Sequence, residues 1–210
     1  MPDDAARTTV PKAFWVTVAV FVATVTQLLV ATLASGLPQF AGKGFGARLV
    51  AYPLLMLLVP ALWALVRRLR REPLTSAVPW SGFALVMAPF LIDVTGNTLN
   101  LYDTIAWWDD ANHLVNWFLL CCGIGVLLLR TTISPPWALG LVVVGSGSLL
   151  ALAWELGEWY TFIRHGTELA TAYEDTLGDQ TLGSVGAVLA GLLVVRLARR
   201  RDAGRVVCHA

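Results

Sequence analysis

Six apolar runs, each long enough to cross a bilayer, constrain this chain more than any other feature. A transmembrane helix needs about 20 mainly apolar residues. Within its 210 residues the chain offers six such runs, at about 13–34, 49–68, 79–99, 111–130, 137–160 and 180–198. They leave too little sequence for a soluble domain. The sequence therefore predicts an all-α polytopic membrane protein, with six transmembrane helices in one bundle and a single membrane domain over residues 1–210.

The first run follows Arg7 and Lys12, as the apolar core of a secretory signal would. Such a core usually has roughly 7–15 residues, and the run at 13–34 is longer than that. We therefore interpret it as an uncleaved first helix.

Basic residues predict the orientation of the six spans. With the N-terminus inside, the inner segments hold Arg7, Lys12, Arg67, Arg68, Arg70, Arg71, Arg130, Arg196, Arg199, Arg200, Arg201 and Arg205, and the outer segments hold Lys43, Arg48 and Arg164. Because basic segments stay on the cytoplasmic side, both termini are predicted to be cytoplasmic. The Arg-rich tail has no interleaved aromatic residues, so we expect membrane lipids as partners and no nucleic acid.

Acidic and amide residues gather at the predicted outer ends of the third to sixth helices. The clusters are Asp93 with Asn97, Asp109 and Asp110 with His113, Glu155 with Glu158, and Asp175 with Asp179 in the loop entering the sixth helix. Residues three or four apart lie on one face of a helix. Carboxylates crowded at a low-dielectric boundary need a counter-charge, so protons or a metal ion are expected there.

One imidazole among carboxylates suits Mn, Fe or Zn, or Mg or Ca if the histidine does not bind. We predict a divalent metal ion of unassigned identity, with ligands Asp110, His113, Glu155 and Asp179. Either Glu158 or Asp175 is predicted to act as general base. Asp93, Asn97 and Asp109 complete the predicted pocket.

The two adjacent aspartates are predicted to have different roles. Neighbouring helix residues point about 100° apart, so Asp109 and Asp110 cannot both face one pocket. Asp110 lies three residues before His113 and is predicted to turn inward, while Asp109 caps the helix. Asp110 and His113 should then lie within contact distance of Glu155 or Asp179.

Simpler interpretations remain open for single residues. Asp109 and Asp179 can serve as acids at helix N-termini, and His113 can be a hydrogen-bonded bundle residue. Five tryptophans are interpreted as an interfacial belt: Trp107, Trp108, Trp117, Trp154 and Trp159. Glu155 and Asp93 lie within apolar segments, and intramembrane acids are usually functional.

Small residues of the sixth run predict close helix packing. Gly183, Ala187 and Gly191 recur every four residues, which allows a neighbouring backbone to approach. Cys121, Cys122 and Cys208 are interpreted as structural or incidental thiols.

The stretches "YDTIAWWDDANHLVNW", "WELGEW" and "YEDTLGDQTLGSVGA" occur in an order that resembles the YjdF-like family of bacterial inner-membrane proteins. More distantly the chain is similar to VanZ-like proteins, in which an Asp and a His open one helix, a Glu ends the next, and an Asp followed by glycines opens another. The likeness covers about residues 90–190. The positions that match the pattern are Asp109 or Asp110, His113, Glu155, Glu158, Asp175, Asp179 and Gly183. The resemblance implies a six-helix, multi-pass protein of the bacterial cytoplasmic (inner) membrane, with cell-envelope roles for some relatives and no assigned reaction.

Three functions follow from these patterns. The first is an outward-facing metal site that acts on an envelope or lipid-linked substrate. The second is a proton- or cation-coupled transporter, and the third is a structural or assembly protein. No inverted repeat occurs and the inner halves of the spans carry no acid, which favours a pocket open on one side.

Overall fold

The computed structural model describes residues 10–75, 77–161, 163–165 and 171–207, which are helical with short connections and contain no strand. Six helices are long: α1 (Lys12–Leu33), α2 (Phe45–Leu69), α3 (Trp80–Thr98), α5 (Trp108–Leu128), α6 (Pro136–Thr161) and α7 (Ala172–Val207). Two are short: α4 (Leu101–Thr104) and the 3₁₀ helix η1 (Ile163–His165). Arg7 and Cys208 lie outside the described residues.

Five of the described helices are long and apolar enough to cross a membrane: α1, α2, α5, α6 and α7. The prediction of six spans is met in part, because α3 is not among these five. α3 carries Asp93 and Asn97 near its C-terminal end, and both lower its apolar character. It packs between α1 and α5, so its polar residues meet protein.

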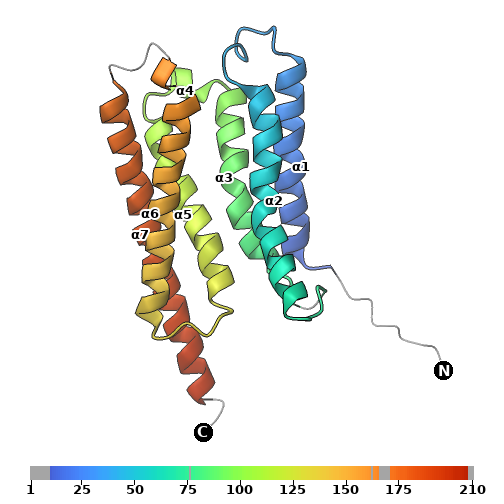
Figure 1. The fold of residues 1–210 in the computed structure, drawn as a ribbon, viewed down its shortest axis with the longest axis vertical. Coiled ribbons are helices and arrows are strands. Elements are labelled where there is room, and N and C mark those ends of the chain that lie inside the picture. Colours follow the sequence, from blue (N-terminus) through green and yellow to red (C-terminus); the bar gives the residue numbers. More distant parts are fainter. Residues whose placement is uncertain (1–9, 76, 162, 166–170, 208–210) are drawn as a thin grey trace, which may run out of the picture.

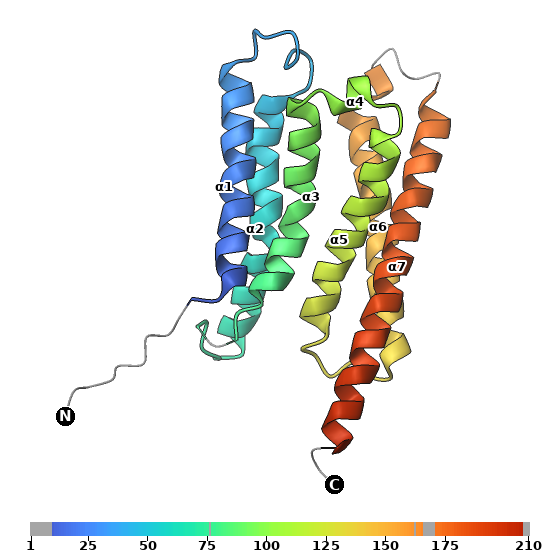
Figure 2. The same ribbon diagram turned by 180° about the vertical axis from the view of Figure 1, so that it is seen from behind.

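The long helices alternate in direction and form two groups of three, α1–α3 and α5–α7 (Figures 1 and 2). The start of α1 and the end of α7 lie at the same end of the bundle, and α4 lies at the opposite end (Figure 1). Within the described chain, the long helices of the two groups are joined along α3 and α5. This seam sets the distance between the groups.

Each group has its own apolar core. Leu139, Val143, Ala187 and Val194 belong to the core of the second group and are at most 2% exposed. As predicted, small residues of α7 allow close packing. A Cβ atom on Gly183 would lie 2.8 Å from Trp117, and Ala187 is fully buried.

The α3–α5 seam depends on a second close approach. A Cβ atom on Gly123 of α5 would lie 2.9 Å from the carbonyl oxygen of Gly82 and 2.9 Å from the amide nitrogen of Val86. Both neighbours are backbone atoms of α3, so they cannot move aside as a side chain can. The two groups also meet where Trp154 of α6 packs on the apolar cluster that contains Tyr52 and Val94.

Two of the helices that begin earlier than their apolar runs have acidic residues in the added turn. α5 begins at Trp108, where Asp109 and Asp110 occupy the first turn. α7 begins at Ala172, with Glu174 and Asp175 in its first turn. Acidic side chains favour the positive end of a helix, so these polar turns join the helix although they are not apolar. The prediction that Asp175 and Asp179 lie in a loop was therefore wrong, because both lie in α7.

The seam generates the first prediction. Gly123→Ala should lower the free energy of unfolding by about 1–3 kcal/mol, because the added methyl group overpacks a backbone contact. Thermal unfolding of purified protein in detergent measures this loss. Gly145→Ala is the matched control, since a Cβ atom there meets nothing within 4 Å. An equal effect of the two substitutions would contradict the close α3–α5 contact.

Candidate functional site

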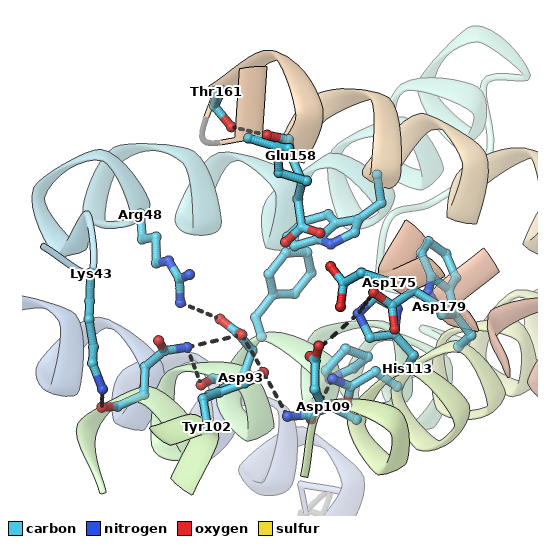
Figure 3. A pocket seen from close by; sticks show the side chains of 18 of the residues that line it. Lys43, Arg48, Asp93, Tyr102, Asp109, His113, Glu158, Thr161, Asp175 and Asp179 are labelled. Atoms are coloured by element: carbon cyan, nitrogen blue, oxygen red, sulfur yellow. Dashed lines mark hydrogen bonds and ion pairs between the residues drawn. The ribbon is translucent and has the colours of Figure 1, made fainter. Parts of the chain in front are cut away.

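A cavity of about 870 Å³ lies at the end of the bundle that carries α4. Both groups of helices contribute walls to it. Its lining includes Lys43 and Arg48 from the first group and Asp109, His113, Glu158, Asp175 and Asp179 from the second (Figure 3). Asp93 and Asn97 of α3 also line it. The cavity therefore collects residues from all four of the polar clusters in the sequence.

His113 lies at the centre of a carboxylate cluster. Its Nε2 atom is 3.5 Å from Asp179 Oδ2 and 3.7 Å from Asp109 Oδ1, and its Nδ1 atom is 3.7 Å from Glu155 Oε1. These residues come from α5, α6 and α7. The prediction that His113 lies within contact distance of Glu155 or Asp179 is confirmed for both.

The cluster is buried and incompletely hydrogen-bonded. His113, Glu155 and Asp179 are 9%, 3% and 4% exposed. His113 Nδ1 and Glu155 Oε1 are buried without a hydrogen-bond partner. A buried polar atom without a partner costs about 1–3 kcal/mol, so a further group bound among these atoms would relieve a real cost.

The inward aspartate is Asp109, and the prediction for the pair of aspartates was wrong. Asp109 contacts His113 at i, i+4, whereas Asp110 is exposed. The N-cap residue of α5 is Trp107, with no side-chain hydrogen bond, so Asp109 is not the cap. The helix begins three residues earlier than its apolar run, and the i, i+4 pair rather than the i, i+3 pair faces the cavity.

Glu158 and Asp175 extend the cluster towards the open end of the cavity. Glu158 is half-buried on α6 and has a carboxylate oxygen in a group with ligand atoms of His113 and Glu155, all within 4.8 Å of one another. Asp175 is exposed and lies one turn before Asp179 on α7. Asp179 is an interior residue of α7, which rules out its interpretation as an N-cap.

Asp93 differs from the acids around His113, because its carboxylate accepts hydrogen bonds from four donors. Its Oδ2 accepts from Arg48 Nη1 at 3.0 Å and from Tyr52 Oη at 2.5 Å. Its Oδ1 accepts from Tyr102 Oη at 2.8 Å and from Asn97 Nδ2 at 3.2 Å. The ionised form of Asp93 is thus held by one cation and three neutral donors.

A row of amide groups continues from Asp93 towards the histidine cluster. Asn116 donates to Asn112 Oδ1 at 2.9 Å, and Asn112 donates to Tyr102 Oη at 2.6 Å. Burial is the main cause that raises the pKa of Tyr102, and the charge of Asp93 raises it further. Tyr102 therefore stays protonated and donates a hydrogen bond to Asp93.

The sequence pairs Asp93 with Asn97 but does not reveal its other three donors, Arg48, Tyr52 and Tyr102. It also assigns no place in the pocket to Asn112, which donates to Tyr102. The available signals were Arg48 and Tyr52 at i, i+4 on one helix face, and the same spacing for Asn112 and Asn116.

The tryptophan belt was only partly right. Trp107 and Trp159 are 61% and 48% exposed, as belt residues would be. Trp117 is 8% exposed and lines the cavity, and Trp154 lines it as well. The prediction was wrong for these two, because their helix faces turn towards the bundle interior.

The Asp93 network gives the second prediction. Asp93→Ala should destabilise the protein by about 3 kcal/mol, because it leaves Arg48 half-buried without its counter-charge. Asp103→Ala should cost about 0–1 kcal/mol, because Asp103 is 57% exposed in its ion pair with Lys43. Unfolding of both variants in detergent provides the comparison. Equal losses would show that the Asp93 network is no stronger than a surface ion pair.

The comparisons with known proteins bear on the family. The family described as "Predicted membrane protein (DUF2238)" matches residues 16–200. That range includes the cavity and all six long helices except the ends of α1 and α7. No curated protein and no solved structure matches the chain. The protein belongs to the DUF2238 family of predicted membrane proteins.

Proposed function

We propose that Asp109, His113 and Asp179 bind a divalent metal ion, and that this centre acts on an envelope or lipid-linked substrate at the outer face of a bacterial cytoplasmic membrane. The protein would then be a single six-span domain with both termini in the cytoplasm. The observation that carries the proposal is the His113 ring, whose two nitrogens both face buried carboxylates. The predicted ligand set changes in two members: Asp109 takes the place of Asp110, and Glu155 becomes a supporting residue.

The spacing of the ligand atoms supports this proposal. Ligands about 2.1 Å from a tetrahedral ion are about 3.4 Å apart. The His113 Nε2 atom lies 3.5 and 3.7 Å from oxygens of Asp179 and Asp109. These distances are too long for hydrogen bonds of ordinary strength, yet they suit atoms that share an ion. One imidazole and two carboxylates favour Zn²⁺ or Mn²⁺.

Glu155 has a supporting place in this proposal, and no longer that of a direct ligand. A histidine that binds metal through one nitrogen commonly donates its other N–H to a carboxylate, which fixes the ring. Glu155 Oε1 faces His113 Nδ1 at 3.7 Å, and it would accept that proton after a small movement. Glu155 would therefore orient the ring from the buried side.

Three protein ligands leave coordination positions open for water or substrate. A metal ion there would polarise a phosphoryl or carbonyl oxygen, or lower the pKa of a bound water. Glu158 is better placed than Asp175 as general base, because it is half-buried beside His113 whereas Asp175 is exposed. Proton removal by Glu158 would need substrate or water within hydrogen-bond reach.

The third prediction is that the purified protein binds a metal ion. It should bind about one Zn²⁺ or Mn²⁺ per chain, and Asp109→Asn should weaken that binding by at least about tenfold, as even supporting residues of metal sites do when mutated. Isothermal titration and metal analysis give affinity and stoichiometry. Asp110→Asn is the matched control, because Asp110 is exposed on the same helix turn. No metal binding, or equal loss in both variants, would overturn the proposed ligand set.

The distribution of charge supports the proposed orientation. Described basic residues cluster at the end opposite the cavity, among them Arg68, Arg130, Arg199 and Arg200. Basic segments next to membrane helices stay in the cytoplasm, so the cavity would face outward. The same distribution argues against a coupled transporter, because acids in the described long helices lie at the cavity end, apart from Asp202 at the far end of α7.

Orientation is the fourth prediction. In a background without native cysteines, Asp103→Cys should react with a membrane-impermeant maleimide added to intact cells, because Asp103 lies beside the cavity mouth and is 57% exposed. Thr131 is exposed at the other end of the bundle, so Thr131→Cys should react only after the membrane is permeabilised. The reverse pattern would place the cavity in the cytoplasm.

A further inference from the structure

The cavity changes from polar to apolar along its depth. At the α4 end it is lined by Asp109, Asp175 and Lys43. Deeper in the bundle the lining is mainly apolar, with Asn116 among Pro89, Phe90, Trp117, Leu120 and Trp154. Along α5 the lining runs from Asp109 to Leu120, which is about 16 Å at 1.5 Å per residue. A small polar substrate would use the outer part of this depth and leave the apolar part unfilled.

The cavity lies between two helices that do not pack along their lengths. Arg48 and Tyr52 of α2 line one side, and Trp154 and Glu158 of α6 line the other. In the described chain the main contact between the groups runs along α3 and α5. From α6, Trp154 packs on the cluster that contains Tyr52 and Val94, but α2 and α6 do not pack helix against helix. The α2 and α6 sides of the cavity are therefore where it can open to the bilayer.

Apolar side chains continue these two cavity faces towards the middle of the membrane. Leu55 lies three residues after Tyr52, and Leu150 lies four residues before Trp154, so each shares a face with its cavity residue. Leu55 is 41% exposed and Leu150 is 43% exposed. An acyl chain lying between α2 and α6 would cover both.

The basic residues of the cavity belong to one side and most of its acids to the other. Lys43 and Arg48 belong to the first group, together with Asp93, which Arg48 binds. The other acids, Asp109, Glu158, Asp175 and Asp179, belong to the second group (Figure 3). Arg48 donates to Asp93 through Nη1, which holds the guanidinium at the cavity wall. Its other N–H groups have no protein partner in the described part of the chain and are available to an anionic group.

We propose that the cavity admits a membrane lipid from the side, between α2 and α6, and binds a phosphate group of its head between Arg48 and the His113 cluster. This inference deepens the proposed function by naming the substrate class, and it rests on the proposed metal to balance the acids facing the phosphate. The acyl chains lie along Leu55 and Leu150. Arginine suits this role because its planar group recognises phosphate oxygens through paired N–H donors.

Four probes separate the parts of the proposal. Protein in a nonionic maltoside detergent with Zn²⁺, free of phospholipid, is tested with phosphatidic acid, diacylglycerol, a diacyl lipid whose head carries only an ammonium group, and glycerol 3-phosphate. Phosphatidic acid should bind at least about tenfold more tightly than each of the others, because it alone joins a phosphate to acyl chains. If glycerol 3-phosphate binds as tightly as phosphatidic acid, the proposal that the ligand is a lipid is overturned. If the ammonium lipid binds more tightly, the proposal that the site recognises a phosphate is overturned.

A photoreactive acyl chain tests the route. A diazirine on the chain of phosphatidic acid should label peptides that contain Leu55 and Leu150, and unlabelled phosphatidic acid should suppress that labelling. Labelling spread over all lipid-facing helices, without suppression, overturns the opening between α2 and α6.

The variant Arg48→Gln, Asp93→Asn removes both charges of the pair, so that neither is left buried without its partner. It should bind phosphatidic acid about tenfold more weakly. Arg68→Gln, an exposed arginine at the far end of α2, should bind as the unchanged protein does. Unchanged binding by the double variant, with its fold retained, overturns the role of Arg48.

The metal is tested separately, so that failure of the proposed function can be distinguished. The Arg48→Gln, Asp93→Asn variant should keep its Zn²⁺ affinity, because neither residue is a proposed ligand. Phosphatidic acid that binds equally well with EDTA would overturn the metal centre while supporting the lipid site. Zn²⁺ binding without binding of phosphatidic acid would overturn the lipid site while supporting the metal centre.

Discussion

The contact between α3 and α5 is the constraint on which the rest of the structure depends. Gly123 brings the α5 backbone against Gly82 and Val86 of α3, and the two groups of three helices are joined along this line. Away from this seam, Arg48 and Tyr52 of α2 and Trp154 and Glu158 of α6 line the cavity. The cavity is thus a consequence of packing at one seam and of its absence at another.

Two acids at this end of the bundle carry their charge in different surroundings: Asp93, which lines the cavity, and Glu155, which is buried beside His113. Asp93 has four donors, one of them Arg48, and its charge is balanced where it stands. Glu155 faces His113 at 3.7 Å with an oxygen that has no hydrogen-bond partner. The first arrangement stabilises the bundle. The second is costly unless something else binds, and this contrast separates a structural acid from a candidate functional one.

The Asp93–Arg48 pair and the His113 cluster come from different groups of helices, and the proposed chemistry uses both. The first group, with the loop between α1 and α2, supplies Arg48 and Lys43 and also Asp93, which Arg48 binds. The second group supplies the histidine and the other carboxylates. A headgroup held between them would meet a cationic side chain on one side and a metal ion on the other. Preorganised charges of this kind act strongly in a site that excludes water. The apolar inner end of the cavity would give the same ligand a place for its chains.

The sequence by itself determined the helical class, the membrane character and the level at which the acids gather, because these depend on local composition and on spacing along one helix. Glu155 and His113 could be singled out in this way, since an ionisable residue within an apolar run is costly wherever the helix packs. The choice of Asp109 over Asp110 depended on the start of α5, which polar residues extend beyond the apolar run. The pairing of Asp93 with Arg48 and Tyr102 depended on contacts between residues up to 45 positions apart. Only the tertiary structure decided these, because helix packing sets which faces meet and no local pattern encodes that choice.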